Sequence, residues 1–318
     1  MKKLLALLLV MTMFLTLAAS ASAGNIPKFM TVGTGSTGGA YYPIGVAIAE
    51  VLTSKLGTQA TAEVTGGSLD NLRLINDGDC DLGIAQGNNM MDAYNGTGDY
   101  VDNAYENINA LFGGLSKGFF QVVVLENSPI QSMADLKGKK VCMGPAGNAA
   151  IILADIVWGK YGFSTDDIKT TYVAYDDGIS QLEDGNVDAV YIQTAIPASA
   201  IQQLAAGGKG YRLISVDEDV ANQLCEEYGY FGYGTIATTV YDNLKEDCKT
   251  MYVSNMVAVR ADLDEDLVYE MTKAIFENLD IIKSSHKAAS GLSLENAVRV
   301  SIPMHPGAER YFKEVGAM

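Results

Sequence analysis

The chain has 318 residues, of which 48% are hydrophobic and 19% are charged, and 38 acidic residues against 22 basic ones give it a net charge of −16. This composition excludes wholesale disorder, and so acidic a chain without a basic patch is a poor partner for nucleic acid or anionic lipid. With only two His and four scattered Cys, we expect no bound metal and no cofactor.

The first 23 residues are typical of a secretory signal peptide. Lys2 and Lys3 precede an uncharged apolar stretch at 4–18, and an Ala-Ser-Ala run ends at Ala23. The apolar stretch is short for a membrane span, which needs about 20 residues, although an uncleaved anchor is the alternative interpretation. We therefore expect cleavage after Ala23 and a periplasmic location.

Strands and helices then alternate in two units that have the same order. The first unit is predicted as strand 29–32, Gly-rich turn 33–39, a helix carrying Ile44 to Leu52, strand 61–65, a helix from Ser68, and strand 81–86. The second is predicted as strand 140–143, turn 144–148, helix 149–160, strand 171–175, helix 179–183 and strand 189–193. Such alternation predicts a mainly parallel α/β sheet flanked by helices in each unit.

A spacing pattern relates the two units. Asp77-Gly78 is followed by Gln86, and Asp184-Gly185 is followed by Gln193 at the same spacing. Each residue of the second set lies 107 positions after its counterpart in the first. Chance similarity of two Asp-Gly turns is the alternative. We favour two alike lobes, joined by hinge strands, with helices at the C-terminus packing on the first. The expected bounds are 24–122 plus 256–318 for lobe 1, 123–255 for lobe 2, 120–125 and 251–259 for the hinge strands, and 267–279 and 308–315 for the C-terminal helices.

Ligands of open α/β sheets bind at the carboxyl ends of strands, beside helix N-termini. If the two lobes face each other, both Gly-rich turns, several hydroxyls and both glutamines lie in one cleft. Backbone amides and helix N-termini in such a cleft form a binding site for an anion. Ser68 taken alone is better explained as a helix N-cap, and it is the convergence of several hydroxyls on one predicted cleft that favours ligand contact. The candidate ligand-binding residues are Thr34, Gly35, Ser36, Thr37, Tyr41, Gly67, Ser68, Asn71, Gln86, Gly147, Asn148, Gln193, Thr194 and Tyr233.

Other chemistries fit the sequence poorly. Gly33, Gly35 and Gly38 have the spacing of a dinucleotide-binding turn, but 65–68 supplies no acidic residue at the end of the second strand. The acidic run at 77–81 begins like a calcium loop but lacks the glycine that such a loop needs at its sixth position. We therefore expect neither a dinucleotide nor calcium.

The positions of the few histidines, arginines and cysteines further limit which functions the sequence supports. His286 and His305 both lie in the C-terminal region, and no pattern pairs them with a nucleophile. Arg73 should point away from its helix core toward solvent or the rim, and only Arg260 is expected near the cleft. Cys225 and Cys248 are the one pair that we consider for a disulfide, and the sequence leaves that question open.

Six segments together resemble the TAXI-type solute-binding proteins of TRAP transporters, over nearly the whole chain after residue 23. They are TGSTGGAYYPIG at 34–45, TGGSLDNLRLI at 65–75, DLGIAQ at 81–86, DLKGKKV at 135–141, LVYEMTK at 267–273 and PMHPGAERY at 303–311. The sequence departs from the family pattern at 144–148 and at 228–233, both in the second lobe.

The resemblance implies a type II-like periplasmic-binding-protein fold and a receptor that passes a small organic anion to a TRAP membrane permease. Known ligands of the family include glutamate and related dicarboxylates. We expect a monomer that is not an enzyme. An exported enzyme on the same scaffold and a stand-alone ligand sensor are the alternatives, and neighbouring permease genes would separate the three.

Overall fold

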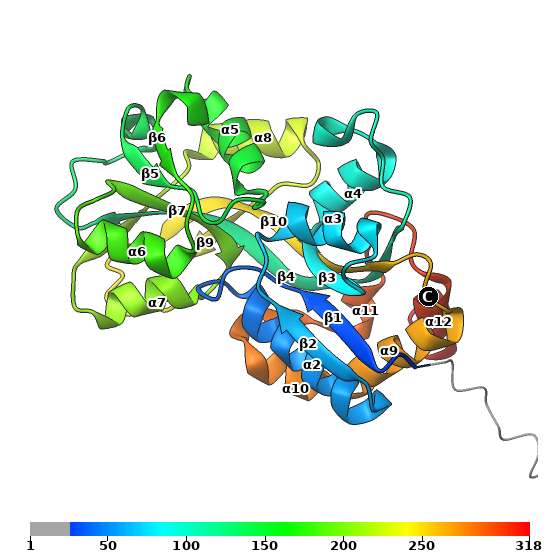
Figure 1. Ribbon diagram of the computed structural model, residues 1–318. Coiled ribbons are helices and arrows are strands. Elements are labelled where there is room, and N and C mark those ends of the chain that lie inside the picture. Colours follow the sequence, from blue (N-terminus) through cyan, green and yellow to red (C-terminus); the bar gives the residue numbers. More distant parts are fainter. Residues whose placement is uncertain (1–25) are drawn as a thin grey trace, which may run out of the picture.

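The computed structural model describes residues 26–318, so the expected signal peptide at 1–23 lies outside the described residues. Two groups of strands and helices lie side by side, and two long strands run through both (Figure 1). We call the group that holds β1 to β3, α2 to α4 and α9 to α12 the first lobe, and the group that holds β5 to β8 and α5 to α8 the second lobe. Within the described residues, no helix is long and apolar enough to cross a membrane.

The strands form one mixed sheet. They are β1 (Phe29–Gly33), β2 (Gln59–Glu63), β3 (Leu82–Gln86), β4 (Ile108–Leu125), β5 (Lys140–Cys142), β6 (Lys169–Thr171), β7 (Ala189–Ala195), β8 (Tyr211–Ile214), β9 (Gly232–Ile236) and β10 (Cys248–Arg260). Their order is β2-β1-β3-β10-β4-β7-β5-β6, with β8 added to β4 and β9 added to β10.

The two lobes repeat one arrangement of strands. In the first, β1 pairs in parallel with β2 and β3, and β10 pairs antiparallel with β3. In the second, β5 pairs in parallel with β6 and β7, and β4 pairs antiparallel with β7. The predicted repeat of mainly parallel units is therefore confirmed.

Helices cover both faces of this sheet. They are α2 (Tyr41–Leu56), α3 (Ser68–Asp77), α4 (Gly87–Asn95), α5 (Ala150–Gly159), α6 (Tyr175–Glu183), α7 (Ser199–Ala206), α8 (Glu218–Glu227), α9 (Glu265–Glu277), α10 (Leu279–Ser285), α11 (Leu294–Ala297) and α12 (Pro306–Glu314). Short 3₁₀ turns are η1 (Gly98–Tyr100), η2 (Met133–Leu136), η3 (Thr165–Asp167) and η4 (Lys287–Gly291).

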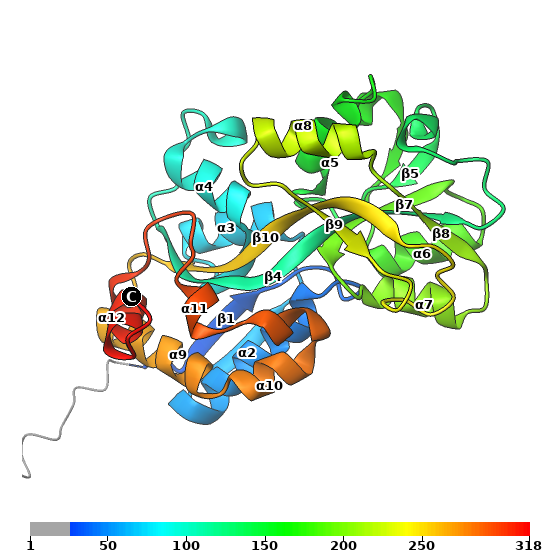
Figure 2. The ribbon, with the colours of Figure 1, turned by 180° about the vertical axis from the view of Figure 1, so that it is seen from behind.

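Each lobe has its own apolar core. In the first, Ile48 of α2 and Ile84 of β3 share one buried cluster with Met271 of α9 and Phe312 of α12. Figure 2 shows α9 and α10 lying beside α2, so the C-terminal helices pack on the first lobe as predicted. In the second, Trp158 of α5 lies against the rings of Phe120 and Tyr191.

The prediction for the region around Tyr175 was wrong. A strand was expected at 171–175 and a helix only from 179, whereas β6 ends at Thr171 and α6 already begins at Tyr175. Asp176 and Asp177 occupy the first turn of α6, where carboxylates interact favourably with the helix dipole. The β-branched and aromatic residues before them had suggested a longer strand.

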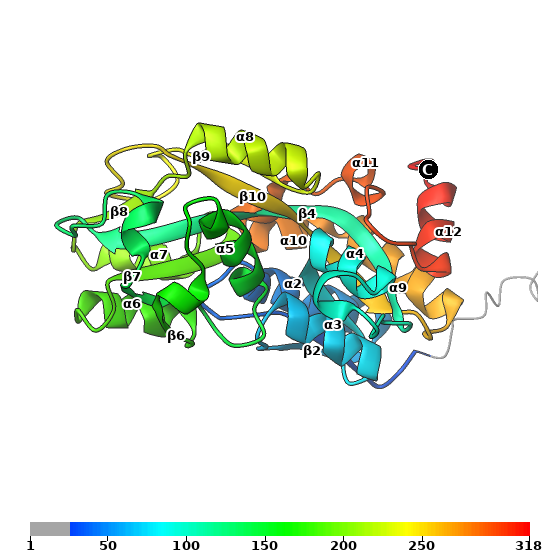
Figure 3. The same cartoon turned by 90° about the horizontal axis from the view of Figure 1, so that it is seen from above.

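Two long strands connect the lobes. β4 has 18 residues and β10 has 13. The predicted hinge segment 251–259 lies within β10, whereas the predicted segment 120–125 lies in the part of β4 that already pairs with β7 and β8 of the second lobe. Seen from above, β4 runs from one lobe into the other (Figure 3). It pairs with β10 from Ile108 to Phe119 and with β7 from Gly118 onward. The β4–β10 register shifts between Asn255 and Ala258, so the ladder is irregular where the chain passes between lobes.

The four cysteines are free thiols. Cys225 lies half-buried on α8 against the core around Trp158, whereas Cys248 lies in a different apolar cluster. The disulfide that the sequence left open is therefore absent. Burial raises the pKa of the Cys248 thiol to about 11.

Thiol titration tests this arrangement. The denatured, unreduced protein should yield four thiols, and the native protein should react mainly at Cys225, because the other three are buried and because a protonated thiol is a poor nucleophile. Finding two thiols after denaturation without reductant would contradict the structure.

Both histidines begin helical segments as neutral N-caps. His286 Nδ1 accepts from the Ala288 amide at 3.1 Å, and its Nε2 lies 2.9 Å from the Pro197 carbonyl. His305 Nδ1 accepts from the Gly307 amide at 3.2 Å, and its Nε2 lies 3.1 Å from the Leu263 carbonyl. Burial lowers the pKa of both imidazoles. Protonation of Nδ1 would remove the acceptor on which each cap depends.

Stability should therefore fall in mild acid. A histidine whose pKa is lowered by folding contributes stability that is present above its unfolded pKa, about 6.5, and is lost as the pH falls. We expect a loss of roughly 1 kcal/mol per histidine between pH 7 and 5, the value of a helix cap. Thermal unfolding of the His286→Asn/His305→Asn double variant, which keeps capping groups that do not titrate, should show a shallower pH dependence. Identical pH profiles would contradict this account.

Candidate functional site

A polar pocket lies between the lobes, at the carboxyl ends of β3 and β7 and beside the turns that follow β1 and β5. Its cavity is only about 20 Å³, room for roughly one water, so the lobes must separate to admit an organic molecule. Thirteen residues line it: Gly35, Ser36, Gly39, Tyr41, Gly66, Gly67, Ser68, Gln86, Pro145, Asn148, Tyr175, Gln193 and Thr194. Nine of these are among the fourteen candidates from the sequence, and the others are Gly39, Gly66, Pro145 and Tyr175.

Five candidates do not line the pocket. Thr34 and Asn71 are fully buried and hold the turns behind it: Thr34 Oγ1 donates to the Glu63 carbonyl at 2.6 Å, and Asn71 Nδ2 donates to the Thr34 and Ile84 carbonyls at 2.7 Å each. Thr37 is exposed and donates to Asp176 at 2.9 Å. The remaining two are Gly147, whose carbonyl accepts from the Asp70 amide at 3.3 Å, and Tyr233, which donates to the Val216 carbonyl at 3.1 Å.

Tyr175 is the main residue that sequence reasoning missed. Its fully buried hydroxyl accepts from Asn148 Nδ2 and from the Gln193 amide, and it lies 3.2 Å from the Gln193 carbonyl. Burial raises its pKa. The signal was available, because Tyr175 stands 107 residues after Ser68, the same offset that relates Gln86 to Gln193. Both residues begin a helix at the pocket wall.

Three hydroxyls in the wall are oriented by backbone amides. Ser36 Oγ accepts from the Tyr175 amide at 3.1 Å, Ser68 Oγ from the Gln86 amide at 3.1 Å, and Thr194 Oγ1 from the Ala40 amide at 3.0 Å. Within the described residues, neither Ser36 nor Thr194 donates a hydrogen bond, so the hydrogen of each hydroxyl is left to offer to a ligand. The Ser68 hydroxyl also bonds the Tyr41 phenol, a contact that lowers the pKa of Tyr41 against the larger effect of burial. Ser68 is therefore not an N-cap; that position belongs to Gly67.

Helix N-termini converge on the same pocket. Tyr41, Ser68 and Tyr175 are the first residues of α2, α3 and α6, and none of these helices has a side-chain cap. Asn148 precedes α5 and accepts from the Ala150 amide at 3.0 Å. Unpaired amides and the positive ends of helix dipoles favour negative charge. Among the lining residues there is no Lys, Arg, His, Asp or Glu, so all of this attraction comes from neutral groups.

Two neighbouring glycines in the wall are required for different reasons, one for its backbone conformation and one for the close approach of the lobes. Gly67 has a φ of +113°, which a residue with a side chain rarely adopts. A Cβ on Gly66 would lie 2.1 Å from the Ala146 carbonyl oxygen of the opposite lobe. Because that neighbour is backbone, any side chain at Gly66 would force the lobes apart.

The side chains of the two glutamines differ in their hydrogen bonding. Gln193 Nε2 donates to the Gly118 carbonyl on β4 at 2.9 Å, and its Oε1 accepts from the Tyr191 hydroxyl at 3.0 Å. Gln86 is 2% exposed, yet its Oε1 has no hydrogen-bond partner in the described chain. A buried amide oxygen without a partner is costly, so Gln86 Oε1 is placed to accept a hydrogen bond from an N–H or O–H group of a ligand.

Tyr41 connects the pocket to the hinge strands. Its hydroxyl donates to Asn255 Oδ1 on β10 at 2.7 Å, and Asn255 Nδ2 donates to Ser116 Oγ on β4 at 2.9 Å. Burial raises the pKa of the Tyr41 phenol. The chain of bonds thus joins one wall of the site to both strands that cross between the lobes.

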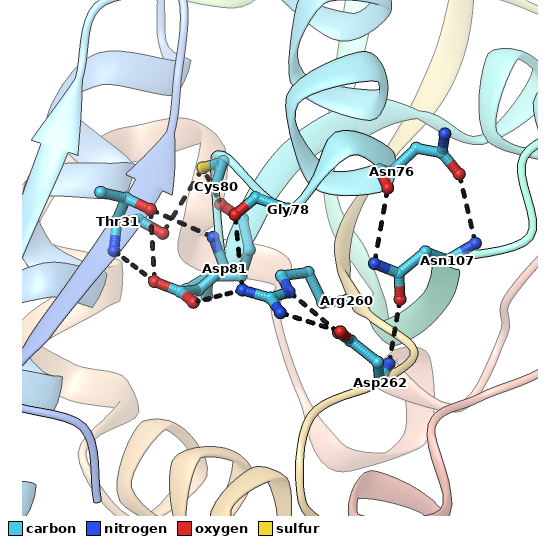
Figure 4. Close-up of polar contacts among 9 residues, drawn as sticks. Thr31, Asn76, Gly78, Cys80, Asp81, Asn107, Arg260 and Asp262 are labelled. Carbon is cyan, nitrogen blue, oxygen red and sulfur yellow. Dashed lines mark hydrogen bonds and ion pairs between the residues drawn. The ribbon is translucent and has the colours of Figure 1, made fainter.

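Arg260 does not lie near the pocket, contrary to the sequence prediction. β10 runs antiparallel to β3, so Asn255 pairs with Gln86 at the pocket end while Arg260 reaches the opposite end. There it contacts Asp262 at 2.9 Å and Asp81 at 3.5 Å (Figure 4). Arg73 pairs with Asp70 and Asp77 on the exposed face of α3, which agrees with the prediction.

Comparison with known proteins identifies the family. The profile of the NMT1-like family matches residues 32–316. The chain belongs to the NMT1-like family. A protein of Escherichia coli (strain K12) that is named for binding aliphatic sulfonates is 30% identical to this NMT1-like chain over 126 residues. That match covers 37% of this chain and only 38% of the relative's length.

Solved structures share the fold of this NMT1-like protein. One described as a periplasmic transporter superposes with a TM-score of 0.56 at 14% identity, over 92% of this chain and 94% of that one. PhnD1 of Prochlorococcus marinus (MIT 9301), solved in complex with methylphosphonate, gives a TM-score of 0.52 at 13% identity, over 92% and 100% of the two chains. The α/β periplasmic-binding-protein fold predicted from the sequence is confirmed.

Removing the bonds across the pocket should open this NMT1-like protein. Ser36 and Thr194 each accept an amide from the opposite lobe, and a hydrogen bond contributes about 0.5–1.5 kcal/mol net. The Ser36→Ala/Thr194→Ala double variant should therefore shift the closed–open equilibrium about 5- to 150-fold toward open, and small-angle scattering should show a larger radius of gyration.

Ser180→Ala is the matched control, because Ser180 Oγ bonds only within α6. An unchanged radius of gyration in the double variant would show that these bonds do not hold the lobes together.

Proposed function

We propose that this protein is an exported receptor that captures a small organic anion between its two lobes and delivers it to a membrane transporter. The observation that carries the proposal is a pocket that lies beside helix N-termini, is lined by hydroxyls and backbone amides, and has no acidic side chain among its lining residues. Cleavage after Ala23 and a periplasmic location complete the proposal. We take 24–122 plus 256–318 and 123–255 as the two bodies that move.

The relatives support an anionic ligand. The E. coli relative is named for aliphatic sulfonates, and the marine structural neighbour holds methylphosphonate. Sulfonates, phosphonates and carboxylates share negatively charged oxygens, which are the natural partners of oriented N–H and O–H donors. A permease of the TRAP type and a glutamate-like or dicarboxylate ligand are the more specific proposals, and they rest on the sequence resemblance to TAXI receptors.

The lining favours a receptor over an enzyme. Amides, hydroxyls and phenols make up its polar groups, and burial raises the pKa of both Tyr41 and Tyr175. A hydrolase or transferase needs a nucleophile paired with a general base, and the two histidines are engaged as helix caps elsewhere. We propose that the protein acts as a monomer, without a cofactor.

Calorimetry with single variants tests how the anion is held. The titrants are 2-oxoglutarate, ethanesulfonate and methylphosphonate. Losing one hydrogen bond to a charged group costs about 1.5–3 kcal/mol, or roughly 10- to 100-fold in affinity. We expect that loss in Ser68→Ala and in Thr194→Ala. The controls Arg73→Ala and Arg260→Ala should bind as the unaltered protein does.

Two outcomes would contradict the proposal. If no titrant binds the unaltered protein, it is not a receptor for small oxyanions. If an arginine variant abolishes binding while both hydroxyl variants retain it, the neutral-donor account is wrong.

A further inference from the structure

A second cavity, much larger than the ligand pocket, lies at the hinge strands. Its volume is about 450 Å³, which is within the range of small-molecule sites. Parts of β4, β10, η4 and α11 line it, together with the residue that follows β7, and Figure 2 shows α11 beside β4. We call it the hinge cavity. It shares no lining residue with the ligand pocket.

Both lobes form the walls of the hinge cavity. Leu115 belongs to the core of the first lobe, and Ala288 of η4 packs against that core. Phe119 belongs to the apolar cluster of β7, α6 and α7 in the second lobe, and Ile196 packs against that cluster. The cavity therefore has this shape only while the lobes keep their closed arrangement, and a molecule that contacts both walls binds the closed form in preference.

The hinge cavity and the ligand pocket lie on opposite faces of the same two strands. Ser254 of β10 pairs with Lys117 of β4. Their neighbours Asn255 and Ser116 also pair, and Asn255 bonds Tyr41 in the wall of the ligand pocket. Because successive residues of a strand point to opposite faces, Ser254 and Lys117 point away from the ligand pocket, and both line the hinge cavity.

The lining combines an apolar floor with two cations. Phe119 and Met256 are buried, whereas Lys117 and Arg299 are exposed. There is no Asp or Glu among the lining residues. Apolar atoms of a ligand would leave water at the floor, while the two cations would attract an acidic group.

Neither cation is held in a strong ion pair. Lys117 Nζ lies 4.2 Å from the centre of the Tyr252 ring, and no carboxylate is paired with it in the part of the chain that the structure describes. Arg299 contacts Glu295 at 2.9 Å, with both side chains exposed, and such a surface pair contributes little. Both cations are therefore available to an anion at the cavity.

We propose that the hinge cavity is a second, regulatory ligand site. Its ligand is an amphipathic organic anion, with an apolar body of one or two rings and a single carboxylate or sulfonate, and its binding stabilises the closed form. By linkage, the same ligand raises the affinity of the ligand pocket for its own anion. This inference goes beyond the proposed function and does not depend on which molecule the ligand pocket takes.

Calorimetry on the full exported chain tests the site. The probes are 1-naphthoate and 1-naphthalenesulfonate, which separate the two acidic groups, and the neutral analogue 1-naphthalenemethanol. At least one anion should bind, and the neutral analogue should bind about 5-fold more weakly. The Lys117→Gln/Arg299→Gln variant should weaken binding of the anion by the same factor, since two exposed ion pairs are lost. Lys249→Gln, an exposed lysine elsewhere on β10, is the matched control.

A second variant places the probe in the cavity. Ser254→Trp fills the hinge cavity from an exposed position of β10 and should abolish binding. Thr235→Trp makes a similar change at an exposed position of β9, outside the cavity lining, and should leave binding unaltered.

Hydrogen exchange measures the coupling to closure. The amides of Ala40 and Tyr175 bond hydroxyls of the opposite lobe, so their exchange reports separation of the lobes. With the probe at ten times its dissociation constant, their exchange should slow about 10-fold if only the closed form binds it. The Asp217 amide, which bonds the Tyr161 hydroxyl within the second lobe, is the control and should exchange at an unchanged rate.

Each outcome has a distinct meaning. If neither anion binds, or if Ser254→Trp leaves binding or the slowed exchange intact, the hinge cavity is not the site and the inference is overturned. Binding that Ser254→Trp abolishes, but that leaves the exchange of both amides unchanged, overturns the regulatory role. Neither result bears on the proposed function, which the small oxyanions test separately. Should Ser254→Trp fail to fold, as thermal unfolding would show, the Lys117→Gln/Arg299→Gln variant decides the question.

Discussion

The pairing of β4 with β10 is the constraint on which the rest of the structure depends. These two strands are the shared edge of both lobes, since β3 pairs with β10 and β7 pairs with β4. Because both pairings are antiparallel, the carboxyl ends of β3 and β7 point toward each other. Gln86 and Gln193, the last or nearly last residues of those strands, are thereby brought to one pocket from 107 residues apart.

The same constraint explains why the pocket is built from neutral groups. The elements that reach it are strand ends and helix starts, which supply amides and short hydroxyl side chains. Charged residues lie at the other end of the ladder, where Arg260 joins Asp81 and Asp262. Tyr41 and Asn255 then tie the pocket wall to the ladder itself, so a ligand that moves Tyr41 acts directly on the hinge.

Much of this could be predicted from the sequence, for physical reasons. Strands alternate with helices in two units that are related by an offset of 107 residues, and this pattern predicts two similar lobes. Gly-rich turns after strands indicate where backbone amides are exposed. The position of Arg260 could not be predicted, because a strand that returns antiparallel places its two ends on opposite sides of the sheet. Tyr233 was misplaced for a related reason, since β9 pairs with β10 away from the pocket. Tyr175 was missed because local β propensity hid the start of its helix.

Gly66 and Ala146 meet through backbone atoms alone, and this has a consequence for how such receptors diversify. A contact that involves no side chain keeps its geometry when neighbouring residues are exchanged. Mutation can therefore change the walls, at Gln86 for example, while this backbone contact between the two halves stays as it is. A substitution of Gly66 would instead alter the contact itself, because a side chain at that position has no room.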